Sequence, residues 1–143
     1  VASLTRVADF EKATANADRL TVVKFFAPWC RACKAMEPKY KRTAARKADA
    51  GAPIDFYEVS IQEGKEIFKH CKIETIPTAL VYCDGQVVAS APVKASTYKK
   101  FEDALVLAER RLSTGYFPVN SCEVYSCKSD DPELTHLSSM WGL

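Results

Sequence analysis

Apolar and polar residues follow one another along the chain with the two periods that distinguish strands from helices. Three β-branched, aromatic or otherwise apolar runs are typical of buried strands: TVVKFFA (21–27), IDFYEVS (54–60) and TALVYC (78–83). Asp84-Gly85 follows the third run and is the strongest hairpin signal in the chain. It predicts that QVVASAPV (86–93) pairs back as a further strand.

Helical spacing of apolar residues predicts helices before, between and after these strands. The expected helices cover residues 3–17, 31–47, 64–72 and 96–111. Pro38 falls inside the second of them and is expected to bend it, because proline has no backbone N–H to donate. The order α-β-α-β-α-β-β-α predicts an α/β fold with a central mixed β-sheet flanked by helices.

The regular pattern ends near Gly115, and the remainder of the chain is rich in Ser, Pro, Asp and Asn. We therefore expect one domain over residues 1–112 and a C-terminal acidic, aromatic-containing extension over residues 113–143. Residues 112–143 carry a net charge of −3 and the first 111 residues carry +5. A total charge of only +2 argues against nucleic acid as the main partner. No apolar run reaches the roughly 20 residues that a transmembrane helix needs, so we do not expect a transmembrane protein.

The candidate chemistry lies in the segment Trp29-Cys30-Arg31-Ala32-Cys33, where a predicted strand gives way to a predicted helix. A helix N-terminus presents unpaired N–H groups and a partial positive charge, which favour the thiolate of Cys30. The thiolate is the nucleophile of thiol–disulfide exchange. Zinc binding is the alternative for a CxxC pair, but it requires two more Cys or His ligands. The pair Cys122 and Cys127 lies in the extension, so we expect no metal.

These residues together resemble the thioredoxin family over residues 5 to 112. The resemblance rests on the strand–WCxxC–helix junction, on Pro38 eight residues after Cys30, on the Ile76-Pro77-Thr78 segment, on the Asp84-Gly85 hairpin and on the element order. The WCRxC form of the motif is similar to that of the atypical thioredoxin-like proteins of plastids.

The resemblance implies a thiol–disulfide oxidoreductase whose only redox group is the Cys30–Cys33 disulfide, with no cofactor. It implies that Cys30 attacks a substrate disulfide and that Cys33 resolves the mixed disulfide. It also implies that Trp29, Ile76 and Pro77 form the apolar surface that docks the substrate backbone.

Arg31-Ala32 replaces the Gly-Pro that thioredoxins usually carry between the two cysteines. A guanidinium beside Cys30 favours the thiolate, and stabilising the reduced form raises the reduction potential, so we expect a couple more oxidising than ordinary thioredoxin. The alternative is that Arg31 points into water and contributes little. Val93 stands where the family commonly has Gly before the last helix. Its side chain is expected to intrude on the docking surface and to narrow the range of substrates.

Lys24, six residues before Cys30, occupies the position where thioredoxins usually hold a buried Asp. An unpaired buried ammonium is costly, so Lys24 needs a partner. The resemblance to the family places Glu58, on the neighbouring strand, beside Lys24, and we expect the two to pair. The alternative is a Lys24 side chain that reaches solvent. If the pair forms, Glu58 would serve as the base and Lys24 would favour the Cys33 thiolate.

The remaining cysteines leave alternatives open. Cys71 is either a regulatory thiol that forms a mixed disulfide or, as we favour, a half-buried packing residue, and Cys83 is expected to be structural. For Cys122 and Cys127 three alternatives remain: the two form a local disulfide, they stay inert thiols, or they relay electrons to the Cys30–Cys33 pair. His70 and His136 are predicted to be surface residues. The apolar end of the extension is expected to dock on the domain's own surface or on a protein partner.

The leading hypothesis is a thiol–disulfide oxidoreductase that acts on disulfide-containing protein substrates and receives electrons from a reductase or a small thiol. The alternative is a thioredoxin-like interaction subunit, held in a larger assembly by its extension, with weak or no redox activity. The WCRxC resemblance, with a start at Val1 that suggests a removed targeting segment, favours the chloroplast; the cytoplasm is the alternative.

Overall fold

The computed structural model describes residues 1–115, which form one five-stranded mixed sheet flanked by helices. The strands, in the sheet order β1-β3-β2-β4-β5, are β1 (Ala2–Ser3), β3 (Ile54–Ser60), β2 (Leu20–Phe26), β4 (Thr78–Cys83) and β5 (Gln86–Pro92). The helices are α1 (Val7–Thr14), α2 (Arg31–Asp49), α3 (Lys65–Cys71) and α4 (Tyr98–Thr114), with a 3₁₀ turn at Ala95–Thr97. The predicted α/β fold with a central mixed sheet is confirmed.

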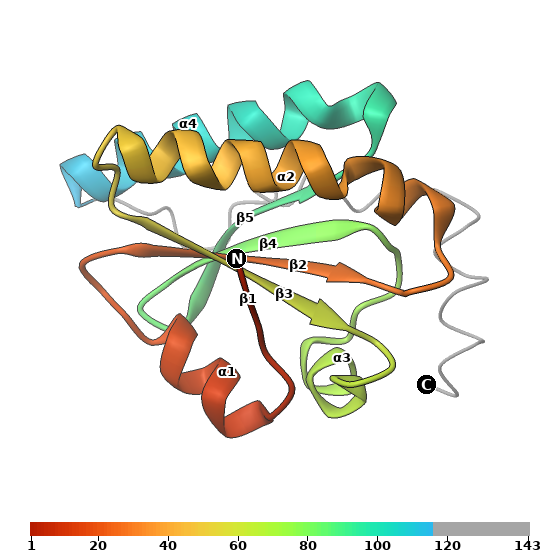
Figure 1. Cartoon of the computed structure of the whole chain (residues 1–143). Coiled ribbons are helices and arrows are strands. Elements are labelled where there is room, and N and C mark those ends of the chain that lie inside the picture. The colour runs from red at the N-terminus through yellow and green to blue at the C-terminus, as the bar shows by residue number, and fades with distance from the viewer. Residues whose placement is uncertain (116–143) are drawn as a thin grey trace.

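The sheet is the middle of three layers, with α2 and α4 on one face and α1 and α3 on the other (Figure 1). Strand β2 lies at its centre, parallel to β3 and antiparallel to β4. Strand β1 pairs with β3 through Ala2 and Ser3. The sequence did not predict it, because two residues are too few to show a period.

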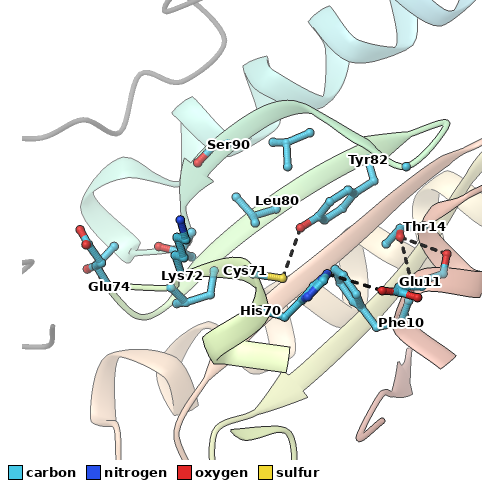
Figure 2. A pocket seen from close by; sticks show the side chains of 15 residues that line it. Phe10, Glu11, Thr14, His70, Cys71, Lys72, Glu74, Leu80, Tyr82 and Ser90 are labelled. Carbon is cyan, nitrogen blue, oxygen red and sulfur yellow. Dashed lines mark hydrogen bonds and ion pairs between the residues drawn. The ribbon is translucent and has the colours of Figure 1, made fainter. Parts of the chain in front are cut away.

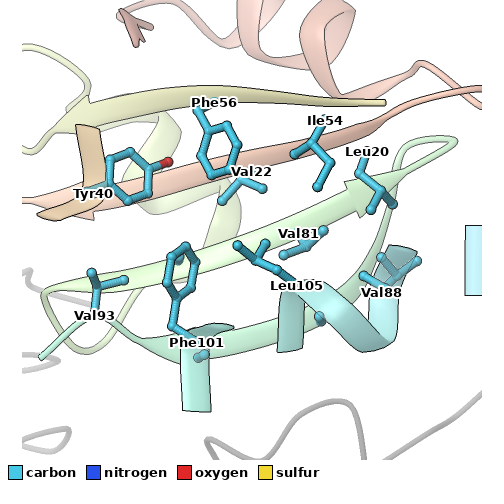
Figure 3. Close-up of a cluster of buried hydrophobic side chains, with 14 of the residues drawn as sticks. Leu20, Val22, Tyr40, Ile54, Phe56, Val81, Val88, Val93, Phe101 and Leu105 are labelled. Atoms are coloured by element: carbon cyan, nitrogen blue, oxygen red, sulfur yellow. The ribbon is translucent and has the colours of Figure 1, made fainter. Parts of the chain in front are cut away.

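The larger part of the core lies between the sheet and the α2–α4 layer (Figure 3). The strands contribute Val22, Phe56 and Val81 to it, and α4 contributes Phe101 and Leu105. Side chains on a strand alternate between its faces, so the even-numbered residues of β2 point into this layer. Lys24 is one of them, and it is therefore directed beneath α2.

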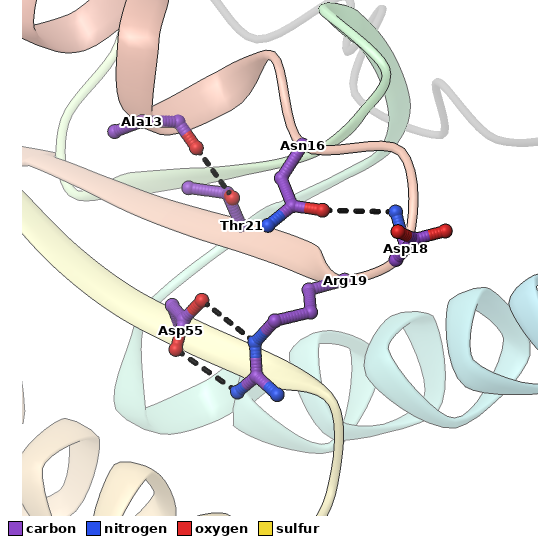
Figure 4. A network of polar contacts seen from close by, with 6 residues as sticks. All are labelled: Ala13, Asn16, Asp18, Arg19, Thr21 and Asp55. Atoms are coloured by element: carbon purple, nitrogen blue, oxygen red, sulfur yellow. Dashed lines mark hydrogen bonds and ion pairs between the residues drawn. The ribbon is translucent and has the colours of Figure 1, made fainter.

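A polar contact joins the two neighbouring strands β2 and β3 near the point where they begin (Figure 4). The Arg19 guanidinium donates two hydrogen bonds of 3.0 Å to the carboxylate of Asp55, and this contact raises the pKa of Arg19. Each side chain is about two-fifths exposed, so we expect at most about 1 kcal/mol from this pair. The same register sets Lys24 on β2 opposite Glu58 on β3.

The last helix begins two residues later and ends three residues later than predicted. Residues Ala95–Thr97 form a tighter 3₁₀ turn instead of the first helical turn. Gly115 ends α4 with a positive φ of 73°, a conformation that glycine adopts without a steric penalty.

Replacing Leu105 by Ala is expected to lower the free energy of unfolding by about 2–5 kcal/mol, because the Leu105 side chain is fully buried. The neighbouring Val106 is 43% exposed, so Val106→Ala in the same helix is the matched control and should change stability by no more than about 0.5 kcal/mol. Urea unfolding followed by circular dichroism measures both. Equal effects of the two substitutions would contradict the packing of α4.

Candidate active site

Cys30 occupies the N-cap of α2, at the turn that follows β2. Its backbone N–H donates to the carbonyl of Ala27 at 3.1 Å, and its Sγ accepts a hydrogen bond from the N–H of Cys33 at 3.2 Å. The sulfur therefore takes the place of the oxygen that usually caps a helix. The helix dipole and the donated N–H both favour a negative charge on this sulfur.

Cys33 lies one turn further along α2 in a very different environment. It is 2% exposed, whereas Cys30 is partly accessible, and both are free thiols. Burial, followed by a side-chain hydrogen bond with Cys30, raises the pKa of Cys33 to about 12. One sulfur is thus placed to meet a substrate disulfide, and the other is held protonated beneath it.

The segment before β4 contains a cis peptide bond and packs against the same apolar cluster as Cys30. The Ile76–Pro77 peptide bond is cis, and the carbonyl of Pro77 accepts a hydrogen bond of 3.0 Å from the N–H of Val93. Ile76 is half-buried and belongs to the same apolar cluster as Cys30. Trp29 is 60% exposed. Trp29, which precedes the accessible thiol directly in the sequence, therefore offers apolar surface that a polypeptide can cover.

The expectation for Val93 is wrong with respect to its side chain. Val93 has no exposed surface and packs in the core with Ala91, Tyr98 and Phe101. Its position directly after β5 turns the side chain toward α4, so it does not intrude on the docking surface. Only its backbone, through the hydrogen bond to Pro77, contributes to the site.

Lys24 and Glu58 form the expected ion pair. Lys24 Nζ lies 3.6 Å from Glu58 Oε2, with 2% of the lysine side chain and 17% of the glutamate side chain exposed. The ammonium also lies over two aromatic rings, 4.7 Å from the centre of Tyr40 and 5.1 Å from that of Phe26. The alternative, a Lys24 side chain that reaches solvent, is excluded by this burial.

Two contacts around this pair were not predicted from the sequence. The hydroxyl of Ser3 donates to Glu58 Oε1 at 3.3 Å, because the short strand β1 pairs with β3. Tyr40 lies two helical turns after Cys33, on the same buried face of α2. The spacing of Cys33 and Tyr40 was a signal that could have placed an aromatic ring beside Lys24.

Arg31 begins α2 with an exposed side chain. This agrees with the alternative expectation, in which the Arg31 guanidinium points into water and contributes little. A solvated charge acts on a neighbouring thiolate mainly at low ionic strength.

Cys71 lines a groove of about 610 Å³ bounded by α1, α3, β4 and β5 (Figure 2). Its half-buried thiol lies 3.6 Å from the hydroxyl of Tyr82, and burial raises its pKa. His70, at the same edge, has a half-exposed side chain 3.8 Å from the Glu11 carboxylate. Cys83 is buried and its thiol donates to the carbonyl of Ala17 at 3.5 Å, in line with a packing role.

The predictions for Cys122, Cys127, His136 and the docking of the extension concern residues outside the described part of the chain and stay predictions. Within residues 1–115, no three His, Cys, Asp or Glu side chains come together as a metal site would need. In the same part of the chain, no helix combines the length and the apolar character required to cross a bilayer.

Comparison with known proteins agrees with this geometry. The family model described as Thioredoxin matches residues 1–107. Thioredoxin-2 of Saccharomyces cerevisiae is 31% identical over 88 residues, which cover 62% of this chain and 81% of the yeast protein. The chloroplastic Thioredoxin-like 2 of Oryza sativa is 32% identical over 92 residues, 63% of this chain but only 40% of the rice protein.

Among solved structures, thioredoxin from Fasciola hepatica superposes with a TM-score of 0.66 at 26% identity. The match covers 74% of this chain and 97% of the Fasciola protein. The family match spans both cysteines, the cis proline segment and the first part of α4, as far as residue 107. This chain therefore belongs to the thioredoxin family.

Proposed function

We propose that this protein exchanges disulfides in protein substrates through Cys30 and Cys33. Membership of the thioredoxin family supports a thiol–disulfide oxidoreductase in general. The observation that carries the specific proposal is the asymmetry of the two sulfurs. Cys30 caps a helix at the surface, and Cys33 is buried one turn behind it.

In the proposed reaction, the Cys30 thiolate attacks one sulfur of a substrate disulfide. A Cys30–substrate disulfide forms, and the other substrate sulfur leaves as a thiolate. The Cys33 thiolate then attacks Cys30 Sγ, so that the Cys30–Cys33 disulfide forms and the second substrate sulfur is released. Two electrons pass to the substrate, and an external thiol or reductase returns them.

Docking of the substrate is assigned to the apolar surface beside Cys30. The exposed Trp29 ring and half-buried Ile76 would contact substrate side chains, and Pro77 would shape the backbone between them. Val93 would contribute only through its backbone N–H, which donates a hydrogen bond to the Pro77 carbonyl. No bound cofactor takes part in this scheme.

We also propose that the protein works in the chloroplast. Support comes from the WCRxC motif and from the rice relative, which is described as chloroplastic. The yeast relative carries no such description. Fractionation of the source cells with an antibody against this chain separates a plastid location from the cytoplasm.

Insulin reduction with dithiothreitol as electron donor tests the central proposal. Cys30→Ser is expected to abolish the catalysed rate, because it removes the attacking sulfur. Cys33→Ser should retain the attack but accumulate a mixed disulfide with insulin, visible on a non-reducing gel. Equal and near-zero rates for the wild type and Cys30→Ser would contradict an enzyme and favour the interaction subunit.

A redox titration against glutathione tests the effect of Arg31. The wild-type midpoint is expected to be less negative than that of ordinary thioredoxin. Arg31→Gly should lower it by only roughly 10 mV at low salt, because an exposed charge interacts weakly and is screened. Arg31→Lys is the control that keeps the charge. A wild-type midpoint at or below that of ordinary thioredoxin would contradict the expectation.

Alkylation kinetics test whether Cys71 is a reactive thiol. Because burial raises the pKa of Cys71, it should react with iodoacetamide at pH 7 at least about tenfold more slowly than Cys30, and its rate should climb as pH increases. Peptide mass spectrometry resolves the two sites. Modification of Cys71 as fast as Cys30 at pH 7 would instead support a regulatory thiol.

A further inference from the structure

The two faces of the sheet are covered unequally. On one face, α4 packs against β4 and β5, whereas α1 and α3 on the other face pack mainly against β2 and β3. The groove of about 610 Å³ lies where this second layer leaves β4 and β5 (Figure 2). Leu80 of β4 and Val87 of β5 line it and are only half-buried. The groove therefore offers apolar surface that a further segment of polypeptide can cover.

One buried polar group of the groove lacks a partner within residues 1–115. Thr78 is 5% exposed, and its hydroxyl makes no hydrogen bond in that part of the chain. Thr78, Leu80 and Tyr82 alternate along β4, so their side chains share the face that lines the groove. An unpaired buried hydroxyl costs free energy. The groove therefore suits an apolar occupant that also brings a hydrogen-bonding group to Thr78.

The C-terminal extension starts near one end of this groove. Helix α4 follows β5 after a short turn and runs back along it (Figure 1). The seven residues of β5 and the seventeen of α4 both span roughly 25 Å, so Gly115 lies at the end of the molecule where β5 begins. Gly85 and Val87, at that end of β5, line the groove. Because β5 is the edge strand of the sheet formed by residues 1–115, the chain can pass around it from one face to the other.

The extension carries a side chain with both properties that the groove requires. Trp141 has a large apolar ring system, and its indole N–H is a donor that usually finds an acceptor when it is buried. Fully extended, residues 116–143 span roughly 90 Å, which is several times the length of β5. Trp141 can therefore reach every part of the groove.

The charged residues at the rim of the groove do not select a small ion instead. Glu11 pairs with His70 at 3.8 Å, and the exposed Lys72 and Glu74 have opposite charges. Attraction comes from the two parts of the chain as wholes, since the first 111 residues carry +5 and residues 112–143 carry −3. Charge complementarity therefore favours the chain's own extension as the occupant.

We propose that this groove is the docking site of the C-terminal extension, with Trp141 as its anchor. The indole ring lies against Leu80 and Val87, and its N–H donates a hydrogen bond to the Thr78 hydroxyl. Cys71, which also lines the groove, is covered by the docked segment. The inference concerns how the extension is held on the domain, so it goes beyond disulfide exchange and does not rest on it.

Hydroxyl-radical footprinting of the full chain, read by peptide mass spectrometry, tests the docking from the side of the extension. Trp29, which is 60% exposed, serves as the internal reference. Docked Trp141 is expected to be oxidised several-fold more slowly than Trp29. Val87→Glu places a charge in the groove wall and should make the two rates equal. Val106→Glu, the same change at a 43% exposed position on α4, is the matched control and should leave Trp141 protected.

Alkylation of Cys71 tests the same contact from the side of the groove and serves if Val87→Glu does not fold. Trp141→Ala is expected to raise the rate at which Cys71 reacts with iodoacetamide several-fold, because it uncovers the groove. The rate at Cys83, which is buried in the cluster on the other face of the sheet, should not change. Tyr125→Ala, which removes a different aromatic ring from the extension, is the control variant and should leave the Cys71 rate unchanged.

Several outcomes would overturn docking in this groove. One is a Trp141 that is oxidised as fast as Trp29 in the wild type, and another is a Cys71 rate that Trp141→Ala does not alter. Protection of Trp141 that survives Val87→Glu would place it at another surface. Protection that appears only as protein concentration is raised would assign the groove to the extension of a second copy. Neither readout depends on disulfide exchange, so failure of the insulin assay would leave this inference untouched.

Discussion

The contact between the Cys33 N–H and the Cys30 sulfur, 3.2 Å long, is the constraint on which the chemistry of this fold depends. It forms because β2 ends at Phe26 and, after a short turn, α2 begins at Arg31, so that Cys30 is the residue that caps the helix. A sulfur in that position receives an N–H and the positive end of the helix dipole. The helix that provides these also carries Cys33 into the core. Activation of one thiol and burial of the other are therefore consequences of the same turn.

The buried pair beneath α2 is unusual in energetic terms. Removing a lysine and a glutamate from water costs several kcal/mol for each ion, and a distance of 3.6 Å with partial exposure of Glu58 recovers this only in part. The ring faces of Tyr40 and Phe26 add attraction for the cation. A well-packed apolar pair would often be at least as stable at such a position.

Much of this arrangement could be predicted from the sequence, because strong local signals agreed with the fold. The β3 and β4 runs and the Asp84-Gly85 turn gave correct elements. The family resemblance, rather than the strand pattern, paired Lys24 with Glu58, and the register of β2 and β3 confirms this pairing. The errors arise where tertiary packing decides. The side chain of Val93 turns into the core because α4 covers it, which residue type alone does not reveal. Strand β1 and its Ser3 contact depend on pairing with residues more than fifty positions away.

Two cations lie near the cysteines, and their surroundings decide which of them has the stronger effect. Arg31 is adjacent to Cys30 in sequence but exposed, so water and salt screen its charge. Lys24 is 2% exposed, and at the lower effective dielectric of the interior a charge acts more strongly over the same distance. The positive charge of Lys24 lowers the pKa of Cys33, but burial has the larger effect and raises it.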